Sequence, residues 1–333
     1  MRKSRSVVAS LTGGGHGCET APVKLPKKVS VGVATAIAMV GITIGQLAWP
    51  APAGAIIDGT TAAATSGRFT VSLRSSIGGG HACGGSLIAP QWVLTALHCA
   101  GAMIGSAWIG SRNVSTPDPG SFNVPIQGWY VPASSIICLP PSGPLDGCST
   151  PPVVANDIAL VKLQTPVTGI AFAKLSANSA NNAPLFSLVT ARGWGQSNVV
   201  GSGALLREAT MISAPGNQCD ASAQTVGYVA THSSMLCTLP TVGIFAPPNH
   251  GATCQGDSGG PATMTNSSGV EYQVGVVSWG SSPCGAFSVF SRVNAVIPWI
   301  VATVGNPCLV DDYRAPSHVV PKCDRMPAAF EVG

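Results

Sequence analysis

Short apolar runs separated by turn-forming residues occur throughout this chain and limit the folds it can adopt. Polar and apolar residues alternate from Arg68 to Arg74, as they do in a strand with one buried face. Between residues 56 and 290 no stretch keeps a helical period for long, and 40 glycines and 27 prolines interrupt the 333 residues. The pattern predicts an all-β fold with one helix over 294–304. Similar short runs occupy 86–88, 93–95, 158–163, 188–191, 272–278 and 288–293.

One glycine-rich segment carries a candidate nucleophile. It reads Gly256-Asp257-Ser258-Gly259-Gly260-Pro261, with an acid directly before the serine. Glycines let the backbone turn sharply and present its N–H groups to a ligand. The N–H groups of Gly256 and Ser258 are therefore candidates for holding one developing oxyanion. A serine in such a segment is more often only a turn residue, so its chemistry depends on partners elsewhere in the chain.

Two further segments supply the partners that a serine nucleophile needs. Residues 95–99 read T-A-L-H-C and contain His98, and residues 156–160 read N-D-I-A-L and contain Asp157. Here and around Ser258 the sequence resembles the trypsin/chymotrypsin-like serine proteases. The order His98, Asp157, Ser258 is the chymotrypsin order and differs from the orders in subtilisin and the α/β-hydrolases.

The resemblance extends over roughly residues 56 to 304. One departure is Leu97, which replaces the second alanine of the family's usual T-A-A-H-C; we expect its neighbours to repack around it without disturbing the reacting groups. His81 matches a structural histidine of the family, and the other histidines besides His98 are also expected to be structural. The further matching blocks are Ile56–Gly59, Cys83–Ile88, Trp92–Leu94, Gly193–Gly195, Ser278–Gly280 and Pro298–Ile300.

The resemblance implies an architecture as well as a chemistry. It predicts two six-stranded antiparallel barrels with a C-terminal helix and the active site between the barrels. We place the N-terminal barrel at 56–165 and the C-terminal barrel with its helix at 166–304. Residues 305–333 then form a C-terminal extension, and residues 1–55 form a leader.

The implied activity is that of a serine endopeptidase that works through an acyl-enzyme. Ser258 is expected to attack the carbonyl, His98 to move the proton, and Asp157 to orient the imidazole. The N–H groups of Gly256 and Ser258 would form the oxyanion hole, with the Ser278 hydroxyl beside Asp157. Two alternatives stay open: an inactive binding protein built on a protease fold, and a membrane-tethered protease.

The substrate pocket implied by the resemblance lacks a charge at its base. Ala252 stands where trypsin carries an acid, so nothing would offset the desolvation of a substrate Lys or Arg. Gly280 would leave one wall open, and Ser288 would narrow the pocket modestly. We therefore expect cleavage after uncharged apolar residues. The predicted substrate-binding residues are Ala252, Thr253, Gln255, Ser278, Trp279, Gly280 and Ser288.

The leader has the charge pattern of a secretory signal. Residues 1–55 hold six basic residues and one acid, so the rest of the chain carries a net charge of −1 although the whole carries +4. No charge occurs from Val29 to Ile57, a pattern typical of a signal peptide with a long basic region, or alternatively of a membrane anchor. We expect cleavage and secretion. No basic patch in the mature part indicates nucleic-acid binding.

The end of the leader bears on activation. In the resembled family a freed N-terminal ammonium pairs with the aspartate before the catalytic serine, here Ile56 with Asp257. The residues before Ile56 are Ala53-Gly54-Ala55, which suit a signal peptidase and contain no basic residue for a second protease to recognise. We therefore expect export itself to create the active N-terminus.

Cysteine usage supports export. Of 11 cysteines, Cys18 lies in the leader, and the even remainder in an exported chain predicts disulfides. The pairing is open from sequence alone. No C-x-x-C occurs, so we expect no metal site and no cofactor. The resemblance suggests Cys83–Cys99, Cys219–Cys237 and Cys254–Cys284, which leaves the local couples Cys138–Cys148 and Cys308–Cys323.

Two segments depart from the family's usual length. Residues 131–155 are proline-rich and directly precede Asp157, so they are either a tolerated surface insertion or a specificity element. Residues 305–333 extend beyond the family's end, and their function is open. The expected partner is a peptide or protein substrate, with no nucleic acid, no membrane after signal cleavage, and a monomeric enzyme.

Overall fold

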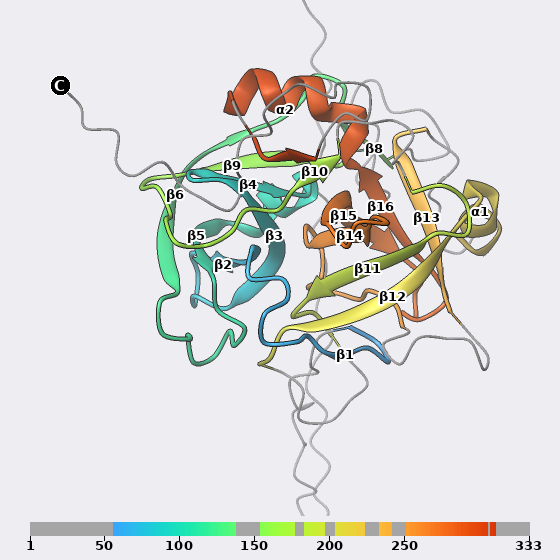
Figure 1. Cartoon of the computed structure of the whole chain (residues 1–333), viewed down its shortest axis with the longest axis horizontal. Coiled ribbons are helices and arrows are strands. Elements are labelled where there is room, and N and C mark those ends of the chain that lie inside the picture. Colours follow the sequence, from blue (N-terminus) through green and yellow to red (C-terminus); the bar gives the residue numbers. More distant parts are fainter. Residues whose placement is uncertain are drawn as a thin grey trace, which may run out of the picture. The chain divides into compact units, whose positions relative to one another are not determined.

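Two barrels of β-strands form the part of the chain that the structure describes (Figure 1). This structure is a computed structural model, and it describes residues 56–137, 154–176, 183–196, 204–223, 233–241, 251–305 and 307–310. The predicted all-β class with two six-stranded antiparallel barrels is confirmed. The division into segments at residues 165/166 and 304/305 stays a prediction, and the leader lies outside the described residues.

The first barrel is closed by six antiparallel strands. In order around the barrel they are β2 (Thr70–Ser75), β3 (His81–Ala89), β4 (Trp92–Thr95), β9 (Ala159–Leu163), β6 (Phe122–Tyr130) and β5 (Ile104–Ile109). The short helix η1 (Leu97–Ala102) follows β4 directly. Because β4 pairs with β9, the segments that lead to His98 and from Asp157 lie side by side, with Thr95 opposite Ala159.

The second barrel closes through the pairing of β14 with β15. Its strands are β14 (Pro261–Thr265), β11 (Leu188–Gly193), β12 (Arg207–Ala214), β13 (Met235–Pro240), β16 (Ser288–Arg292) and β15 (Glu271–Gly280). The larger sheet also includes β1 (Thr60–Thr61) on β12, and β10 (Leu175–Ser176) between β15 and β17 (Leu309–Val310). A separate pair is formed by β7 (Ile136–Ile137) and β8 (Val154–Ala155).

The predicted C-terminal helix is present as two consecutive elements. A 3-10 turn, η3 (Val293–Val296), leads into α2 (Ile297–Val304), where Pro298 stands in the first turn that tolerates proline. A second helix, α1 (Gly216–Ala223), was not predicted, because eight residues are too few to show a helical period. The longer strands not predicted from sequence are 104–109, 122–130, 207–214, 235–240 and 261–265. The two-residue strands 60–61, 136–137, 154–155, 175–176 and 309–310 were not predicted either.

Packing joins the two barrels through a shared apolar core. Buried side chains of the first barrel, such as Leu87 and Leu160, belong to the same cluster as Val276 of β15 and Ile300 of α2. The second barrel has its own cluster around Met211 and Phe290. Burial of such side chains contributes about 1.5–3 kcal/mol each, so the shared cluster holds the residues between the barrels in fixed positions.

The disulfides suggested by the resemblance form in the structure where they can be observed. Cys83–Cys99, Cys219–Cys237 and Cys254–Cys284 are all bonded. Cys308 is also disulfide-bonded, and its predicted partner Cys323 lies outside the described residues. The predicted couple Cys138–Cys148 lies outside them as well. Within the described part, no helix is long and apolar enough to cross a membrane.

Candidate active site

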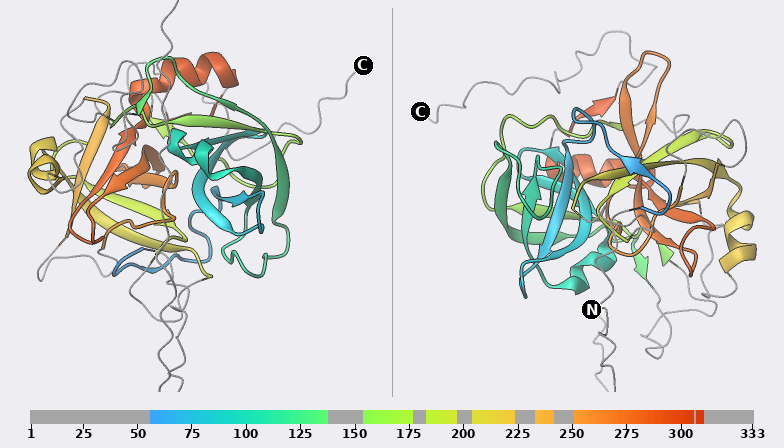
Figure 2. Two further views of the ribbon diagram at one scale, coloured as in Figure 1. Left: turned by 180° about the vertical axis from the view of Figure 1, so that it is seen from behind. Right: turned by 90° about the horizontal axis from the view of Figure 1, so that it is seen from below.

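His98 and Asp157 meet at the junction of the barrels. The His98 ring Nδ1 lies 2.7 Å from Asp157 Oδ2, and the His98 backbone N–H donates to Asp157 Oδ1 at 3.0 Å. The Ser278 hydroxyl of β15 donates to Asp157 Oδ2 at 2.6 Å. A carboxylate only accepts hydrogen bonds, so Nδ1 carries the proton and Nε2 is left as the basic nitrogen. Figure 2 (left) shows η1, the short teal helix that carries His98, on the side of the first barrel facing the second.

A left-handed residue directs the Asp157 side chain inward. Asn156 has φ 48°, a conformation that asparagine tolerates better than most residues. Its side-chain amide donates to the Ser134 carbonyl at 3.1 Å, and its backbone N–H donates to the Ser234 hydroxyl at 3.2 Å. The Asn156 carbonyl accepts from the Ser135 hydroxyl at 2.7 Å. These three hydrogen bonds fix the turn that precedes Asp157. Asp157 itself is only 1% exposed.

The two groups shift each other's protonation. Burial alone lowers the pKa of His98, but the hydrogen bond and negative charge of Asp157 outweigh it and raise that pKa above its ordinary value. Burial alone raises the pKa of Asp157, but His98 and the Ser278 hydroxyl outweigh it and lower that pKa. Asp157 therefore favours its ionised form, and the protonated form of His98 is stabilised relative to a free histidine.

The segment around Ser258 is packed against the first barrel. The Gly84 N–H of β3 donates to the Ser258 carbonyl at 2.6 Å. Gly259 has φ 81°, and a Cβ at this position would overlap Thr95 Oγ1 and the Gly84 carbonyl. Within the described residues, no hydrogen bond joins the Ser258 hydroxyl to the His98 ring; such bonds are often long in unliganded enzymes and tighten when substrate binds.

Asp257 is fully buried beneath this segment. Its carboxylate accepts the Gly195 N–H at 2.8 Å, the Cys254 N–H at 2.9 Å and the N–H of Ile56. Burial raises the pKa of Asp257 to about 7, although the three N–H donors lower it. Ile56 is itself fully buried. The structure thus brings together the two residues of the predicted activation pair.

His81 supports the backbone of the same segment. Its Nε2 lies 2.9 Å from the Gly256 carbonyl, and its Nδ1 lies 2.8 Å from the Ser72 hydroxyl. Burial lowers the pKa of His81 to about 4, so the ring is neutral at physiological pH. A neutral ring has one N–H, and the Gly256 carbonyl can only accept, so Nε2 donates. This residue holds the peptide unit next to the predicted oxyanion donor.

A cavity of about 190 Å³ opens beside Ser258. Five predicted substrate-binding residues line it: Thr253, Gln255, Ser278, Trp279 and Gly280. The sequence interpretation missed Cys254, Val277, Ser281, Ser282 and Cys284, which also line it. Each of them stands within a few residues of a predicted one, so the two segments 253–255 and 277–284 were the signal.

Two of the predicted pocket residues do not line this cavity. Ala252 is fully buried and pairs with Ile57 through two backbone hydrogen bonds of 3.0 and 3.1 Å. Ser288 is also fully buried, and its hydroxyl accepts the Thr253 N–H at 3.0 Å and lies 2.9 Å from the Thr253 hydroxyl. Thr253, which lines the cavity, therefore lies between Ser288 and the cavity. Ala252 and Ser288 can influence a bound substrate only through the residues that they contact.

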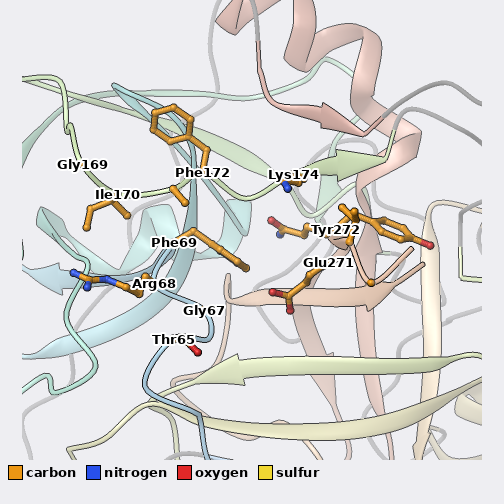
Figure 3. Close-up of a pocket in the computed structure, with 14 residues that line it drawn as sticks. Thr65, Gly67, Arg68, Phe69, Gly169, Ile170, Phe172, Lys174, Glu271 and Tyr272 are labelled. Atoms are coloured by element: carbon orange, nitrogen blue, oxygen red, sulfur yellow. The ribbon is translucent and has the colours of Figure 1, made fainter. Parts of the chain in front are cut away.

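A larger cavity, of about 480 Å³, has other residues in its walls (Figure 3). Its charged members are Arg68, Lys174 and Glu271, and its other walls come from Thr65, Gly67, Phe69 and residues 169–172, 269–270 and 272–273. None of the predicted site residues lines it, and it contains no serine or histidine. The smaller cavity is therefore the candidate substrate site, because it borders the candidate nucleophile.

The described residues offer one cluster with the spacing of metal ligands. It consists of Cys83, His98 and Cys99. Both sulfur atoms belong to the Cys83–Cys99 disulfide, and a disulfide sulfur is no thiolate ligand. This cluster therefore does not fit a metal ion.

Comparison with known proteins agrees with this geometry. The family model described as Trypsin matches residues 56–300, which is most of the chain. Brachyurin of Leptuca pugilator is 28% identical over 229 residues, and the match covers 67% of this chain and 88% of Brachyurin. The chain therefore belongs to the trypsin family and is a serine-type endopeptidase.

Proposed function

We propose that the chain is a secreted endopeptidase in which Ser258, His98 and Asp157 form the catalytic triad. The observation that carries the proposal is the 2.7 Å contact between His98 Nδ1 and the buried Asp157 carboxylate, next to the segment that presents Ser258. This arrangement leaves His98 Nε2 as the base for a serine hydroxyl. The leader and the disulfides support export from the cell.

The reaction would proceed in two halves. Ser258 Oγ attacks the carbonyl carbon of the scissile peptide bond while His98 Nε2 takes the hydroxyl proton. The tetrahedral intermediate collapses when His98 gives that proton to the leaving amine, and an ester of Ser258 remains. Water then attacks the ester with His98 again as base. Asp157 stays ionised throughout and stabilises the imidazolium.

The oxyanion would be held by the N–H groups of Gly256 and Ser258. Within the described residues neither N–H has a hydrogen-bond acceptor in the protein, so both are available to a substrate carbonyl oxygen. The His81 ring fixes the Gly256 carbonyl of the same backbone segment. Removing one oxyanion donor costs about 10²–10³ in rate in related chemistry.

The substrate preference would be for an uncharged apolar residue before the scissile bond. Among the residues that line the 190 Å³ cavity there is no acidic or basic side chain. A substrate Lys or Arg would lose its hydration there without gaining a carboxylate. A peptide library dominated by cleavage after Lys or Arg would contradict this preference.

Activation would follow from removal of the leader. Ile56 already contacts the Asp257 carboxylate through its N–H, and cleavage after Ala55 would turn that amide into an ammonium. The charge would then offset the buried carboxylate and stabilise the segment from Gly256 to Ser258. N-terminal sequencing of the active secreted protein tests this step; an active enzyme that begins anywhere other than Ile56 contradicts it.

Labelling by an active-serine phosphonate probe tests the triad. The secreted protein should be labelled covalently, and Ser258→Ala should abolish both labelling and peptide hydrolysis. Asp118→Asn, a change in the loop between β5 and β6 of the first barrel, serves as a matched control that should still be labelled. Labelling that persists in the Ser258→Ala variant would exclude Ser258 as nucleophile, and absent labelling of the wild type would favour an inactive binding protein.

A further inference from the structure

The short strands β7 and β8 pair with each other next to the turn that carries Asp157. They belong to segment 131–155, which the sequence left open between a surface insertion and a specificity element. Ser135 directly precedes β7, and Asn156 directly follows β8. Because the two strands are antiparallel, the residue before β7 lies beside the residue after β8. The pairing therefore brings Ser135 to Asn156, the residue before Asp157.

The carbonyl of Asn156 accepts two hydrogen bonds. The Ile158 N–H donates to it at 2.7 Å, which closes a three-residue turn with Asp157 at its centre. The Ser135 hydroxyl donates to the same oxygen, also at 2.7 Å. Since this carbonyl belongs to the peptide unit that joins Asn156 to Asp157, the Ser135 hydroxyl bears directly on the direction in which the Asp157 side chain leaves the backbone.

The side chain of Asn156 adds a second contact between the same two segments. Its amide donates to the Ser134 carbonyl at 3.1 Å. Asn156 is 8% exposed, and among the described residues its buried amide oxygen has no hydrogen-bond partner. A buried acceptor without a partner is unfavourable. What asparagine contributes here is therefore its NH₂ donor, together with its tolerance of a φ of 48°.

Ser135 has a fixed place on the barrel that carries Asp157. The strand before it, β6, pairs with β9, and Tyr130 at the end of β6 lies opposite Leu160. Between Tyr130 and Ser135 the chain makes a turn in which the Ser135 N–H donates to the Pro132 carbonyl at 3.0 Å. Pro132 is buried. The Ser135 hydroxyl thus approaches Asn156 from an anchored backbone.

From these contacts we infer that Ser135 and Asn156 are positioning residues for proton transfer, which act by fixing the direction of the Asp157 carboxylate. This inference rests on the proposed function, because the direction of the carboxylate matters for catalysis only if Asp157 orients the His98 ring. The ring Nδ1 lies 2.7 Å from the carboxylate, so a rotated turn would weaken that contact. The part of segment 131–155 next to Asp157 then contributes to catalysis.

Four variants of the secreted protein test the inference. Ser135→Ala removes the hydroxyl, and Ser135→Thr restores one. Asn156→Gly removes the amide but leaves a residue that adopts a positive φ without strain. Ser121→Ala is the matched control, because its half-buried hydroxyl also donates to a backbone carbonyl at 2.7 Å, that of Asp118 in the loop before β6.

The measurements are kcat, KM and the pH profile of kcat/KM on a peptide that the wild type cleaves. Misplacement by about 1 Å can cost about 10²-fold in rate, so we expect Ser135→Ala and Asn156→Gly to lower kcat about tenfold and to change KM less than about twofold. Asp157 raises the pKa of His98 against the effect of burial, so a weakened contact should move the acid limb of both variants to lower pH. Ser135→Thr and Ser121→Ala should match the wild type.

A fall in kcat without a displaced acid limb would overturn the inference, because loss of folded enzyme lowers kcat but leaves the pKa of His98 unchanged. An unchanged kcat in Ser135→Ala or Asn156→Gly would overturn it as well, while the activity of the wild type still upholds the proposed function. If one of these two variants does not fold, the other decides. A wild type that cleaves no peptide and takes no phosphonate label would overturn the proposed function and the inference with it.

Discussion

Asp157 is the residue whose environment matters most for the chemistry. Its carboxylate accepts three hydrogen bonds, from the His98 ring, the His98 backbone and the Ser278 hydroxyl, so both of its oxygens are engaged. Replacing it by asparagine would keep the shape but introduce an amide that can donate. The His98 ring would then be free to adopt the tautomer with the proton on Nε2, which cannot accept a proton from Ser258.

We predict that Asp157→Asn lowers kcat by about 10⁴, the size of effect seen in this class of triad, with a smaller effect on KM. The pKa of His98 is raised chiefly by Asp157 against the opposing effect of burial. The wild type should therefore lose activity as the pH falls through the pKa of His98, which lies above the ordinary pKa of a histidine. In Asp157→Asn the residual activity should persist to lower pH. A pH profile of kcat/KM measures both, and an acid limb at the same pH in the two proteins would contradict the coupling.

Sequence interpretation indicated His98 and Asp157, which the structure brings together and whose catalytic roles stay predictions, and it was weaker for the residues that line the cavity. His98 and Asp157 are contiguous in space because β4 and β9 pair, and flanking motifs already indicated those segments. Ala252 and Ser288 were expected in the pocket, but they pack behind Thr253 and against Ile57. Which side of a strand or loop faces a cavity depends on its neighbours in space, and a single sequence does not contain that information.

At the scale of elements, the segment from Asp257 to Pro261 depends on glycine. Gly259 has φ 81° and packs against β3 and β4, where the Thr95 hydroxyl also donates to the Gly84 carbonyl at 2.8 Å. Gly269, in the turn between β14 and β15, has a similar φ of 76°, but a Cβ there would meet nothing within 4 Å. The two positions therefore separate the cost of backbone strain from the cost of steric overlap.

We predict that Gly259→Ala destabilises the protein clearly more than Gly269→Ala. Both substitutions incur a left-handed strain of about 1–2 kcal/mol. Only Gly259→Ala adds an overlap with Thr95 and Gly84, which would displace the segment that carries Ser258. Thermal unfolding and kcat/KM of both variants measure this. Equal losses of stability in the two, with activity retained in Gly259→Ala, would show that the segment is less tightly packed than the structure indicates.

Elements differed in how well the sequence predicted them. The runs at 86–88 and 272–278 lie inside β3 and β15, and both strands were found because their apolar residues stand between clear turns. β6 was missed because only one of its nine residues is buried, so it has no apolar stripe. The helix α1 was missed because the periodic signal of eight mostly polar residues is weak.

At the scale of the whole molecule, the N-terminal segment of the described chain ties both halves of the site together. β1 pairs with β12, Arg207 donates to the Gly59 carbonyl, and Arg112 of the first barrel donates to the Ala62 carbonyl. These contacts guide Ile56 to Asp257. The family resemblance predicted this pair, whereas the arginines that secure the segment had no sequence signal, because their partners are backbone carbonyls.

The charge state of Asp257 should report whether the leader has been removed. In the uncut chain, burial raises the pKa of Asp257 to about 7. A carboxyl group whose folded pKa lies above its unfolded value stabilises the fold in its neutral form, so stability is lost as pH rises from about 4 to about 7. A free ammonium at Ile56 would favour the ionised carboxylate and remove this loss.

We therefore predict different pH behaviour for two forms of the chain, both carrying Ser258→Ala to prevent self-cleavage. Relative to a form that begins at Ile56, a form that begins at Gly54 should become progressively less stable between pH 4 and pH 7; His81, whose pKa is lowered to about 4, titrates in both forms and cancels in this comparison. Asp257→Asn in both forms is the control and should remove the pH-dependent difference between them, because the group whose pKa differs is gone. Melting temperatures across the range measure the effect. Parallel curves for the Gly54 and Ile56 forms would show that the freed N-terminus does not reach Asp257, and export would then not be the activating step.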